Sequence, residues 1–156
     1  MTVAFEWAGL SPDLPGAPRG GARAGARADA REAVGTPILV VDDDPEILAM
    51  LRDFLEGEGF SIRTATNGAE ALQAIDQVAP ALILLDMRMP VLDGWGFAAR
   101  LRERQEAYPI IVMTAAQSAQ RWAEEIGANG FIAKPFDVDE LLQTIERHRR
   151  RDHRPN

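Results

Sequence analysis

Short runs of apolar residues alternate with longer amphipathic segments over most of the chain. The short runs are four or five residues long, and Ile38-Leu-Val-Val41 has the continuous, β-branched character of a buried parallel strand. The segments between the runs carry apolar residues at helical spacing. The pattern therefore predicts five strands, each followed by a helix, with the strands at residues 38–41, 60–64, 81–85, 109–113 and 130–133.

This alternation predicts an α/β fold, a doubly wound parallel sheet with helices on both faces. Helix starts are marked by Asp44 before Pro45, and by Asn67 with an acidic residue three positions on, at Glu70. Asp137 has the same relation to Glu140. The last helix is expected to bury one apolar stripe, formed by Val138, Leu141, Leu142 and Ile145.

The N-terminal segment differs from the rest of the chain in its amino-acid composition. From Pro15 to Gly35, 18 of 21 residues are Ala, Gly, Arg or Pro. Such a stretch buries too little apolar surface to offset the entropy lost on ordering. We therefore expect residues 1–36 to form a disordered tail.

The composition excludes several classes of site. The chain has no cysteine and two histidines, which excludes disulfides, thiol catalysis, Cys-ligated zinc and a His-rich metal centre. No apolar run approaches the ~20 residues of a membrane helix, and the N-terminus lacks the basic start of a secretory signal. We therefore expect a cytoplasmic protein without membrane insertion.

Charge is distributed unevenly along the chain. Residues 37–146 carry 8 basic and 19 acidic side chains, whereas residues 147–156 carry five Arg and one Asp. A segment this acidic argues against direct binding of DNA. The chain has a single lysine, Lys134, against sixteen arginines. A site that requires a compact ammonium group would explain it.

Chemically distinctive residues follow four of the predicted strands. Asp42 and Asp43 follow the first strand, and Asp86 follows the third. Thr114 and Lys134 follow the fourth and fifth. Each of these residues alone has an ordinary explanation as a turn former, helix cap or packing residue. We interpret the neighbouring Asp44 in this way, as the cap of the helix that follows. Together they converge on the edge of the sheet where such folds bind ligands, and clustered carboxylates with an ammonium group suit Mg²⁺ and a phosphate.

Four stretches of the chain resemble the receiver domain of bacterial response regulators, in the order found in that family. They are Ile38-Leu-Val-Val-Asp-Asp-Asp-Pro45, Leu82-Ile-Leu-Leu-Asp-Met-Arg-Met-Pro90 with Asp93-Gly94, Ile110-Ile-Val-Met-Thr-Ala115, and Gly130-Phe-Ile-Ala-Lys-Pro-Phe136. The resemblance covers residues 37–148 and leaves 149–156 as a basic C-terminal tail. It implies a flavodoxin-like sheet of five parallel strands in the order 2-1-3-4-5.

The resemblance also implies roles for individual residues. Asp86 is the implied phosphoacceptor. Mg²⁺ is the implied cofactor, and its implied protein ligands are Asp42, Asp43, Asp86 and the backbone carbonyl of Arg88.

Thr114 and Lys134 are the implied ligands of the phosphoryl oxygens, and Phe131 is the implied aromatic switch residue. A cis peptide bond is implied between Lys134 and Pro135.

The family resemblance implies a protein of two-component or phosphorelay signalling that catalyses its own phosphorylation and dephosphorylation and is no turnover enzyme. The implied partners are a histidine kinase or phosphotransfer protein and a downstream protein target. About ten residues follow the last stripe position, so we expect a stand-alone receiver.

The segment from Thr114 to Lys134 is about two residues shorter than usual in the family, so the fourth helix or the loop before it must be trimmed. Trp95 and Trp122 are unusual there, and we expect both to be partly buried packing residues.

Two alternatives remain open. Asp42-x-Asp44 after an apolar strand resembles the haloacid-dehalogenase phosphohydrolases, in which the first Asp is the nucleophile and the second the acid or base. Pro45 and the lack of a later acidic pair count against this reading, and it leaves Asp86 without a role. The second alternative is a pseudo-receiver that is not phosphorylated and acts only as a scaffold.

Overall fold

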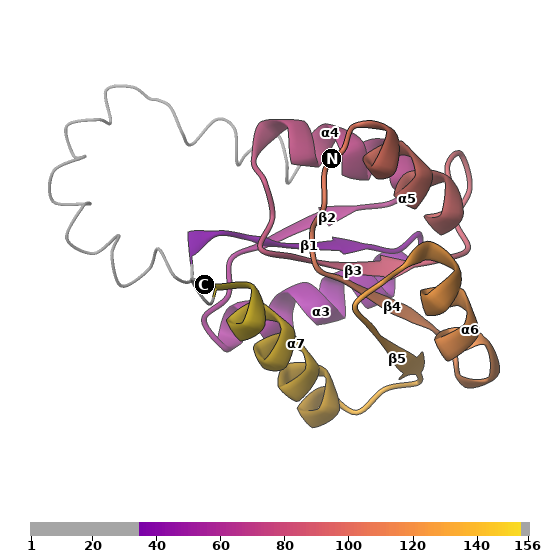
Figure 1. Cartoon of the computed structure of the whole chain (residues 1–156). Coiled ribbons are helices and arrows are strands. Elements are labelled where there is room, and N and C mark those ends of the chain that lie inside the picture. Colours follow the sequence, from indigo (N-terminus) through magenta and orange to yellow (C-terminus); the bar gives the residue numbers. More distant parts are fainter. Residues whose placement is uncertain (1–34, 154–156) are drawn as a thin grey trace, which may run out of the picture.

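The computed structural model describes residues 35–153, with side chains as far as Arg149. Its centre is one five-stranded sheet in the order β2-β1-β3-β4-β5 (Figure 1). All pairings in the sheet are parallel. The strands are β1 (Ile38–Val41), β2 (Ile62–Ala65), β3 (Leu82–Asp86), β4 (Ile110–Ala115) and β5 (Gly130–Lys134). The predicted α/β class, flavodoxin-like topology and strand order are confirmed.

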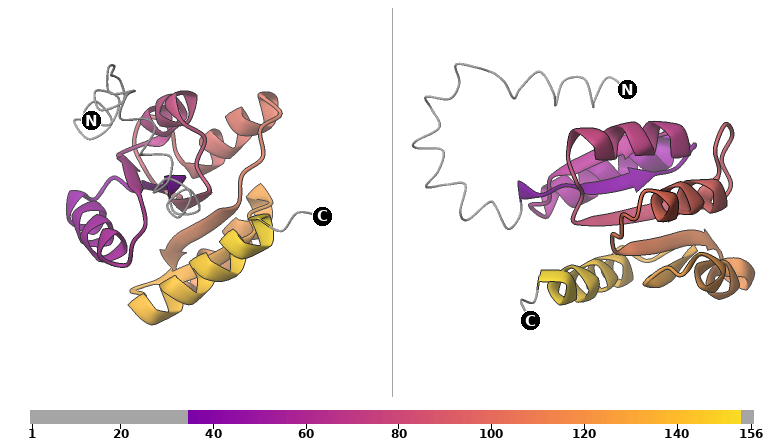
Figure 2. Two further views of the ribbon diagram at one scale, coloured as in Figure 1. Left: turned by 90° about the vertical axis from the view of Figure 1, so that its left-hand side faces the viewer. Right: turned by 45° about the horizontal axis from the view of Figure 1, so that its top comes forward.

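In the described part of the chain, five helices cover the sheet, and they divide between its two faces. They are α3 (Pro45–Gly57), α4 (Gly68–Gln77), α5 (Gly94–Glu103), α6 (Ala116–Ile126) and α7 (Val138–His153). Buried side chains of α4, α5 and α6 pack on one face of the sheet. Those of α3 and α7 pack on the other. Figure 1 shows α4 and α5 above the sheet with α3 and α7 below it, and Figure 2 shows α7, in yellow, from two further directions.

The helix starts follow the predicted signals with one local difference. Asp44 caps α3 by accepting from the N–H of Glu46 at 2.9 Å, and Asn67 caps α4 by accepting from the N–H of Glu70 at 2.9 Å. The carboxylate of Glu70 accepts from the N–H of Thr66, one residue before the position that a capping box uses. Both caps satisfy N–H groups that have no partner inside the helix.

The ends of the elements differ from the sequence predictions in ways that affect the site. Asp86, Thr114 and Lys134 lie within the last residues of their strands rather than after them. The hydrogen bonds of the sheet ladder therefore fix their backbone. Helix α6 begins directly after β4, at Ala116, with no residue between the two elements. The chain therefore has no connecting loop between β4 and α6.

Helix α7 departs from the predicted apolar stripe at its first position. Leu141 and Ile145 are fully buried, but the side chain of Val138 is 36% exposed. Val138 is the first residue of the helix, where the chain has only begun to approach the sheet. The helix also continues to His153, so the expected boundary at 148 falls within it.

The predicted tail of residues 1–36 lies outside the described residues except for Gly35 and Thr36. In the part of the chain from 35 to 153, every helix is too short or too polar to cross a membrane.

Candidate functional site

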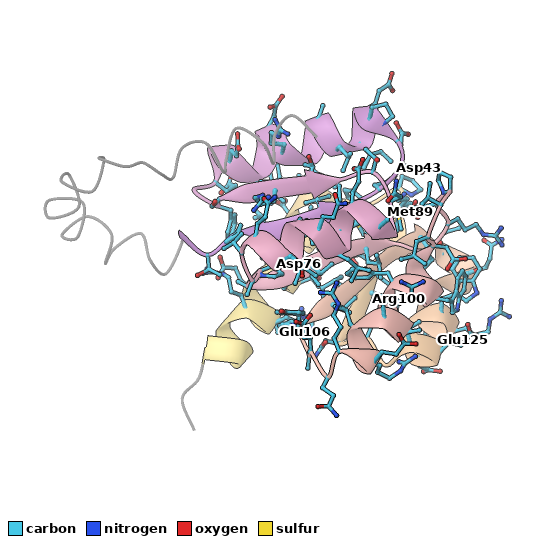
Figure 3. All side chains as sticks on the ribbon, turned by 90° about the horizontal axis from the view of Figure 1, so that it is seen from above. Asp43, Asp76, Met89, Arg100, Glu106 and Glu125 are labelled. Carbon is cyan, nitrogen blue, oxygen red and sulfur yellow. The ribbon has the colours of Figure 1, made fainter. Side chains whose placement is uncertain are left out.

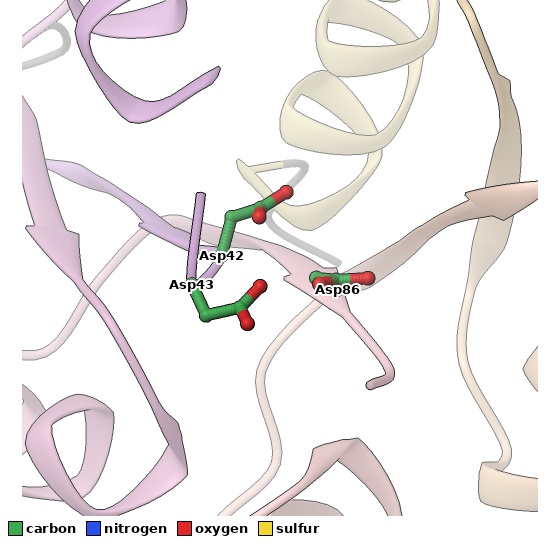
Figure 4. Close-up of side chains that lie close together, drawn as sticks. All are labelled: Asp42, Asp43 and Asp86. Carbon is green, nitrogen blue, oxygen red and sulfur yellow. The ribbon is translucent and has the colours of Figure 1, made fainter. Parts of the chain in front are cut away.

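Three carboxylates meet where the neighbouring strands β1 and β3 end. Val41 pairs with Leu85 in the sheet, so Asp42 and Asp86 come next to each other at the carboxyl edge. Asp43 follows on the same loop. One carboxylate oxygen from each of the three lies within 4.8 Å of the others (Figure 4). The structure therefore brings together the acidic residues that the sequence singled out.

The three carboxylates differ in burial. Asp42 is 1% exposed and Asp86 is 8% exposed, whereas Asp43 faces solvent. One oxygen of Asp42 accepts from the N–H of Asp44 at 2.9 Å, which orients this carboxylate. Asp86 and Asp42 thus form the closed part of the site, and Asp43 forms its open side.

The local environment raises the pKa of Asp86 to about 6. Burial is the largest cause, and the negative charge of Asp42 is the next. Lys134 and the backbone N–H of Arg88, which donates to the Asp86 carboxylate, oppose the shift. Desolvation and a like charge both disfavour an ionised carboxylate, so a further cation at this site would favour the charged form of Asp86.

Lys134 is the cation that the described residues place between the carboxylates. Its Nζ lies 2.8 Å from Oδ2 of Asp42 and 3.7 Å from Oδ1 of Asp86. Lys134 ends β5, at the sheet edge, and the peptide bond to Pro135 is cis. The single lysine of the chain is therefore at the acidic cluster.

Thr114 is buried near the end of β4, and the residue before it, Met113, pairs with Asp86. Val112 pairs with Phe131 across β4 and β5. Because side chains two residues apart on a strand share a face, Thr114 and Phe131 lie on the same face, the one that α6 covers. Phe131 is 43% exposed.

The loop after Asp86 is tightly held. The N–H of Gly94 donates to the carbonyl of Met87 at 3.0 Å, which closes the loop at its base. A Cβ on Gly94 would lie 2.8 Å from the Cα of Met87, a backbone atom that cannot move aside easily, so this close approach requires glycine. The loop therefore holds the backbone of Arg88 in one place relative to Asp86.

The donor set fits Mg²⁺. It consists of oxygen atoms only, from carboxylates of which one is open to solvent, and Mg²⁺ prefers one or two carboxylates together with waters and phosphate oxygens. The negative charge of the cluster, which Lys134 alone does not balance, also favours a divalent cation. Asp42, Asp43 and Asp86 are the residues that would hold it.

A family model described as the response regulator receiver domain matches residues 38–146. The chain belongs to the response regulator receiver family. The transcriptional regulator NtrC of Escherichia coli K12 is 38% identical over 112 residues, which are 70% of this chain and 24% of NtrC. The regulatory protein PrrA of Mycobacterium tuberculosis is 39% identical over 111 residues, 70% of this chain and 48% of PrrA. The receiver thus spans a quarter to a half of these relatives.

Solved structures agree with this assignment. The response regulator TrrA of Thermotoga maritima, in complex with Mg²⁺ and beryllium fluoride, superposes with a TM-score of 0.65 at 32% identity, covering 72% of this chain and 98% of TrrA. A receiver domain from Francisella gives a TM-score of 0.68 at 30% identity, covering 74% of this chain and 98% of that domain.

One group of residues beside the site was not predicted to take part in it. The rings of Trp95 and Trp122 meet edge to face with centroids 4.9 Å apart, and Nε1 of Trp95 donates to Glu125 at 2.8 Å. The guanidinium of Arg88 lies 5.1 Å from the ring centroid of Trp122. The expected burial of both tryptophans is confirmed. The stacked arginine was not predicted, because this contact joins residues 34 positions apart and no local pattern indicates it.

Proposed function

We propose that this receiver accepts a phosphoryl group on Asp86 in a Mg²⁺-dependent reaction, and that the phosphoryl group changes a surface read by another protein. The observation that carries the proposal is the arrangement at the carboxyl edge of the sheet. A buried carboxylate with a raised pKa, Asp86, lies beside two further carboxylates and within 3.7 Å of an ammonium group. The complex of TrrA with Mg²⁺ and beryllium fluoride supports the same reading.

The reaction is an in-line transfer to a carboxylate oxygen. An ionised oxygen of Asp86 forms a bond to phosphorus while the bond from phosphorus to the donor breaks, and the donor leaves with that electron pair. Bound Mg²⁺ would offset the charge of the carboxylates and of the transferred group. The chain's own residues supply position and charge: Lys134 and Thr114 reach the phosphoryl oxygens. In this proposal the chain catalyses its own phosphorylation and dephosphorylation, and it is not an enzyme that turns over a separate substrate.

Lys134 has a second role in this proposal. In the structure its ammonium group lies closer to Asp42 than to Asp86. If Asp42 held a metal ion, its carboxylate would attract Lys134 less strongly, and the ammonium group would be available to the phosphoryl oxygens. The backbone carbonyl of Arg88, on the closed loop after Asp86, would be a further ligand of Mg²⁺.

Switching is proposed to pass through Thr114 and Phe131. Thr114 moves toward the phosphoryl group, and the space that it leaves on the face covered by α6 accommodates Phe131. The exposure of Phe131 in this structure, 43%, supports an inward movement. Only a few kcal/mol of differential stabilisation are needed for such a two-state shift.

The proposed partners are a histidine kinase or phosphotransfer protein as donor and a protein target as reader. Direct DNA binding is not proposed for this segment, because residues 37–146 carry more than twice as many acidic as basic side chains. A donor kinase that uses ATP implies a cytoplasmic location. NtrC and PrrA are transcriptional regulators, and the parts of them outside the matched residues have no counterpart in the described structure.

The two alternatives have less support. A phosphohydrolase reading needs Asp44 as acid or base, but the Asp44 carboxylate caps α3. A pseudo-receiver would not require the assembled cluster of Asp42, Asp86 and Lys134.

The test is labelling of the full chain with acetyl phosphate. We expect one phosphoryl group per chain in the presence of Mg²⁺, none with a chelator, and none in Asp86→Asn. Asp53→Asn, on the exposed surface of α3, is the control and retains the label. Label that survives in Asp86→Asn, or that is found on Asp42, contradicts the proposal and favours the phosphohydrolase. No label at all favours the pseudo-receiver.

A further inference from the structure

The side chain of Arg88 is attached beside the phosphoacceptor but rests on an aromatic ring. The backbone N–H of Arg88 donates to the Asp86 carboxylate, so the side chain starts next to that group. Its guanidinium nevertheless lies on Trp122, 5.1 Å from the ring centroid. The charges that act on Asp86 are those of Asp42, Lys134 and Asp43.

The ring under Arg88 is firmly placed. Trp122 is 8% exposed and belongs to the core between α6 and the sheet. Trp95 packs against it edge to face, and Trp95 is itself held by its hydrogen bond to Glu125. Arg88, in contrast, is exposed. Of the two partners in this stacking contact, the arginine is the one free to move.

We propose that Arg88 is a phosphoryl-positioning residue. It rests on Trp122 while Asp86 is unmodified, and it moves onto the phosphoryl oxygens once they are present. This inference rests on the proposed function of Asp86. It adds a residue that no part of the sequence argument assigned to phosphoryl binding through its side chain.

The physical reason is a competition between two partners for one guanidinium. A phosphoryl group adds about two negative charges and three acceptor oxygens. Arginine pairs with such oxygens through a planar fork, and these charge-assisted hydrogen bonds are stronger than a cation–π contact at an exposed side chain. Lys134 is a single ammonium group, so a phosphoryl group with three acceptor oxygens and about two negative charges has room for a second cation. Without a phosphoryl group, Trp122 is the better partner.

The competition predicts effects of opposite sign for its two members. Loss of the guanidinium removes a contact to the phosphoryl group, so it weakens the binding of that group or of its mimic, beryllium fluoride. Loss of the aromatic ring removes the resting position and strengthens binding. When the guanidinium is absent, loss of the ring has no further effect. A merely structural role of this cluster would weaken binding in both variants.

The experiment measures the affinity of the full chain for beryllium fluoride in the presence of Mg²⁺, with ¹⁹F NMR as the readout. We expect Arg88→Met to bind about tenfold more weakly than the wild type. Arg100→Met, which removes the same charge from an exposed position on α5, is the matched control and binds as the wild type does. Trp122→Leu is expected to bind about threefold more tightly, and the double variant to match Arg88→Met.

A second measurement does not depend on the folding of the Trp122 variant. Because the guanidinium of Arg88 lies over the ring of Trp122, we expect the ring current to shift the Nε–H resonance of Arg88 upfield in the wild type. We expect that shift to disappear when beryllium fluoride and Mg²⁺ are added. The side-chain resonance of Arg100 serves as the reference.

The outcomes separate the inference from the function on which it rests. If the wild type does not bind beryllium fluoride, the proposed function fails and the inference fails with it. If the wild type binds and Arg88→Met binds equally well, the function stands and the inference is wrong. Retention of the ring-current shift in the complex also overturns it, because Arg88 has then stayed on Trp122. Weaker binding by Arg88→Met together with loss of the shift supports the inference.

Discussion

At the scale of single residues, the surroundings of Asp86 disfavour the ionised form of its carboxyl group. Asp86 is buried beside Asp42, and both effects raise its pKa. Lys134 lowers the pKa only in part, since its ammonium group lies nearer to Asp42. The folded protein without a metal ion therefore carries an electrostatic cost at this edge of the sheet, and that cost depends on pH.

Asp86→Asn should stabilise the metal-free protein at neutral pH. The pKa of Asp86 is about 6 in the folded protein against an ordinary value of 3.8, so folding takes up a proton between these values and the charged carboxylate disfavours the folded state above them. We expect a gain in the free energy of unfolding of about 1–2 kcal/mol at pH 8, reduced for solvent screening at the open edge. The gain should shrink as the pH falls through 6 and vanish near pH 4.

Urea unfolding in a chelating buffer at several pH values measures this difference. The comparison of variant with wild type cancels the groups that both proteins share. A gain that stays constant from pH 4 to pH 8 would show that the ionisation of Asp86 is not its source.

At the scale of elements, the loop from β3 to α5 contains a strained turn next to the site. The N–H of Leu92 donates to the carbonyl of Pro90 at 2.7 Å, which closes a γ-turn around Val91. Val91 has a φ of 70°, in a region that a β-branched residue rarely adopts. Its side chain is 81% exposed, so packing does not compensate for the strain. The carbonyl of Leu92 accepts from the N–H of Gly68, which joins the loop to α4.

Val91→Gly should stabilise the protein by about 1 kcal/mol. Glycine adopts a positive φ without steric cost, and this relief exceeds the extra entropy that glycine gives the unfolded chain. Val138→Gly is the matched control, because Val138 is also exposed but begins α7. There the same substitution should destabilise by about 0.5–1 kcal/mol. Thermal or urea unfolding of the two variants checks the signs, and a loss of stability in Val91→Gly would mean that the turn is not strained.

The sequence predicted the elements better than their contacts. Strong local signals, such as the apolar run before Asp42 and the cap at Asn67, placed the strands and helices correctly. The exposure of Val138 was missed because periodicity alone does not tell where a helix meets the sheet. The strain at Val91 was missed because valine has no turn signal. The stacking of Arg88 on Trp122 was missed because it depends on how α6 packs, which a local pattern does not encode.

At the scale of the whole molecule, the site occupies one end of the sheet and an independent charge network lies toward the other. Arg104 bonds to Asp76 at 2.9 Å and lies 3.6 Å from Glu106. In Figure 3, Asp43 and Met89 lie at one end of the molecule, while Asp76 and Glu106 lie toward the opposite end. Between these ends, the core under α4, α5 and α6 and the core under α3 and α7 are separated by the sheet. Thr114 shares its face of the sheet with Val112, which belongs to the core under α4, α5 and α6, so a change that passes through Thr114 reaches that core first.

Amide hydrogen exchange with and without Mg²⁺ and beryllium fluoride should show this asymmetry. We expect exchange to change in α6 and β5, which flank Thr114 and Phe131, and to stay the same in α3 and around Arg104. Thr114→Val keeps the shape of the side chain and removes the hydroxyl that would follow the phosphoryl group. In this variant beryllium fluoride still binds through Asp86 and Lys134, but the change in β5 should be lost, because nothing draws residue 114 away from the space that Phe131 enters. A uniform change over both cores, or an equal change in Thr114→Val, would mean that the signal leaves the site by another route.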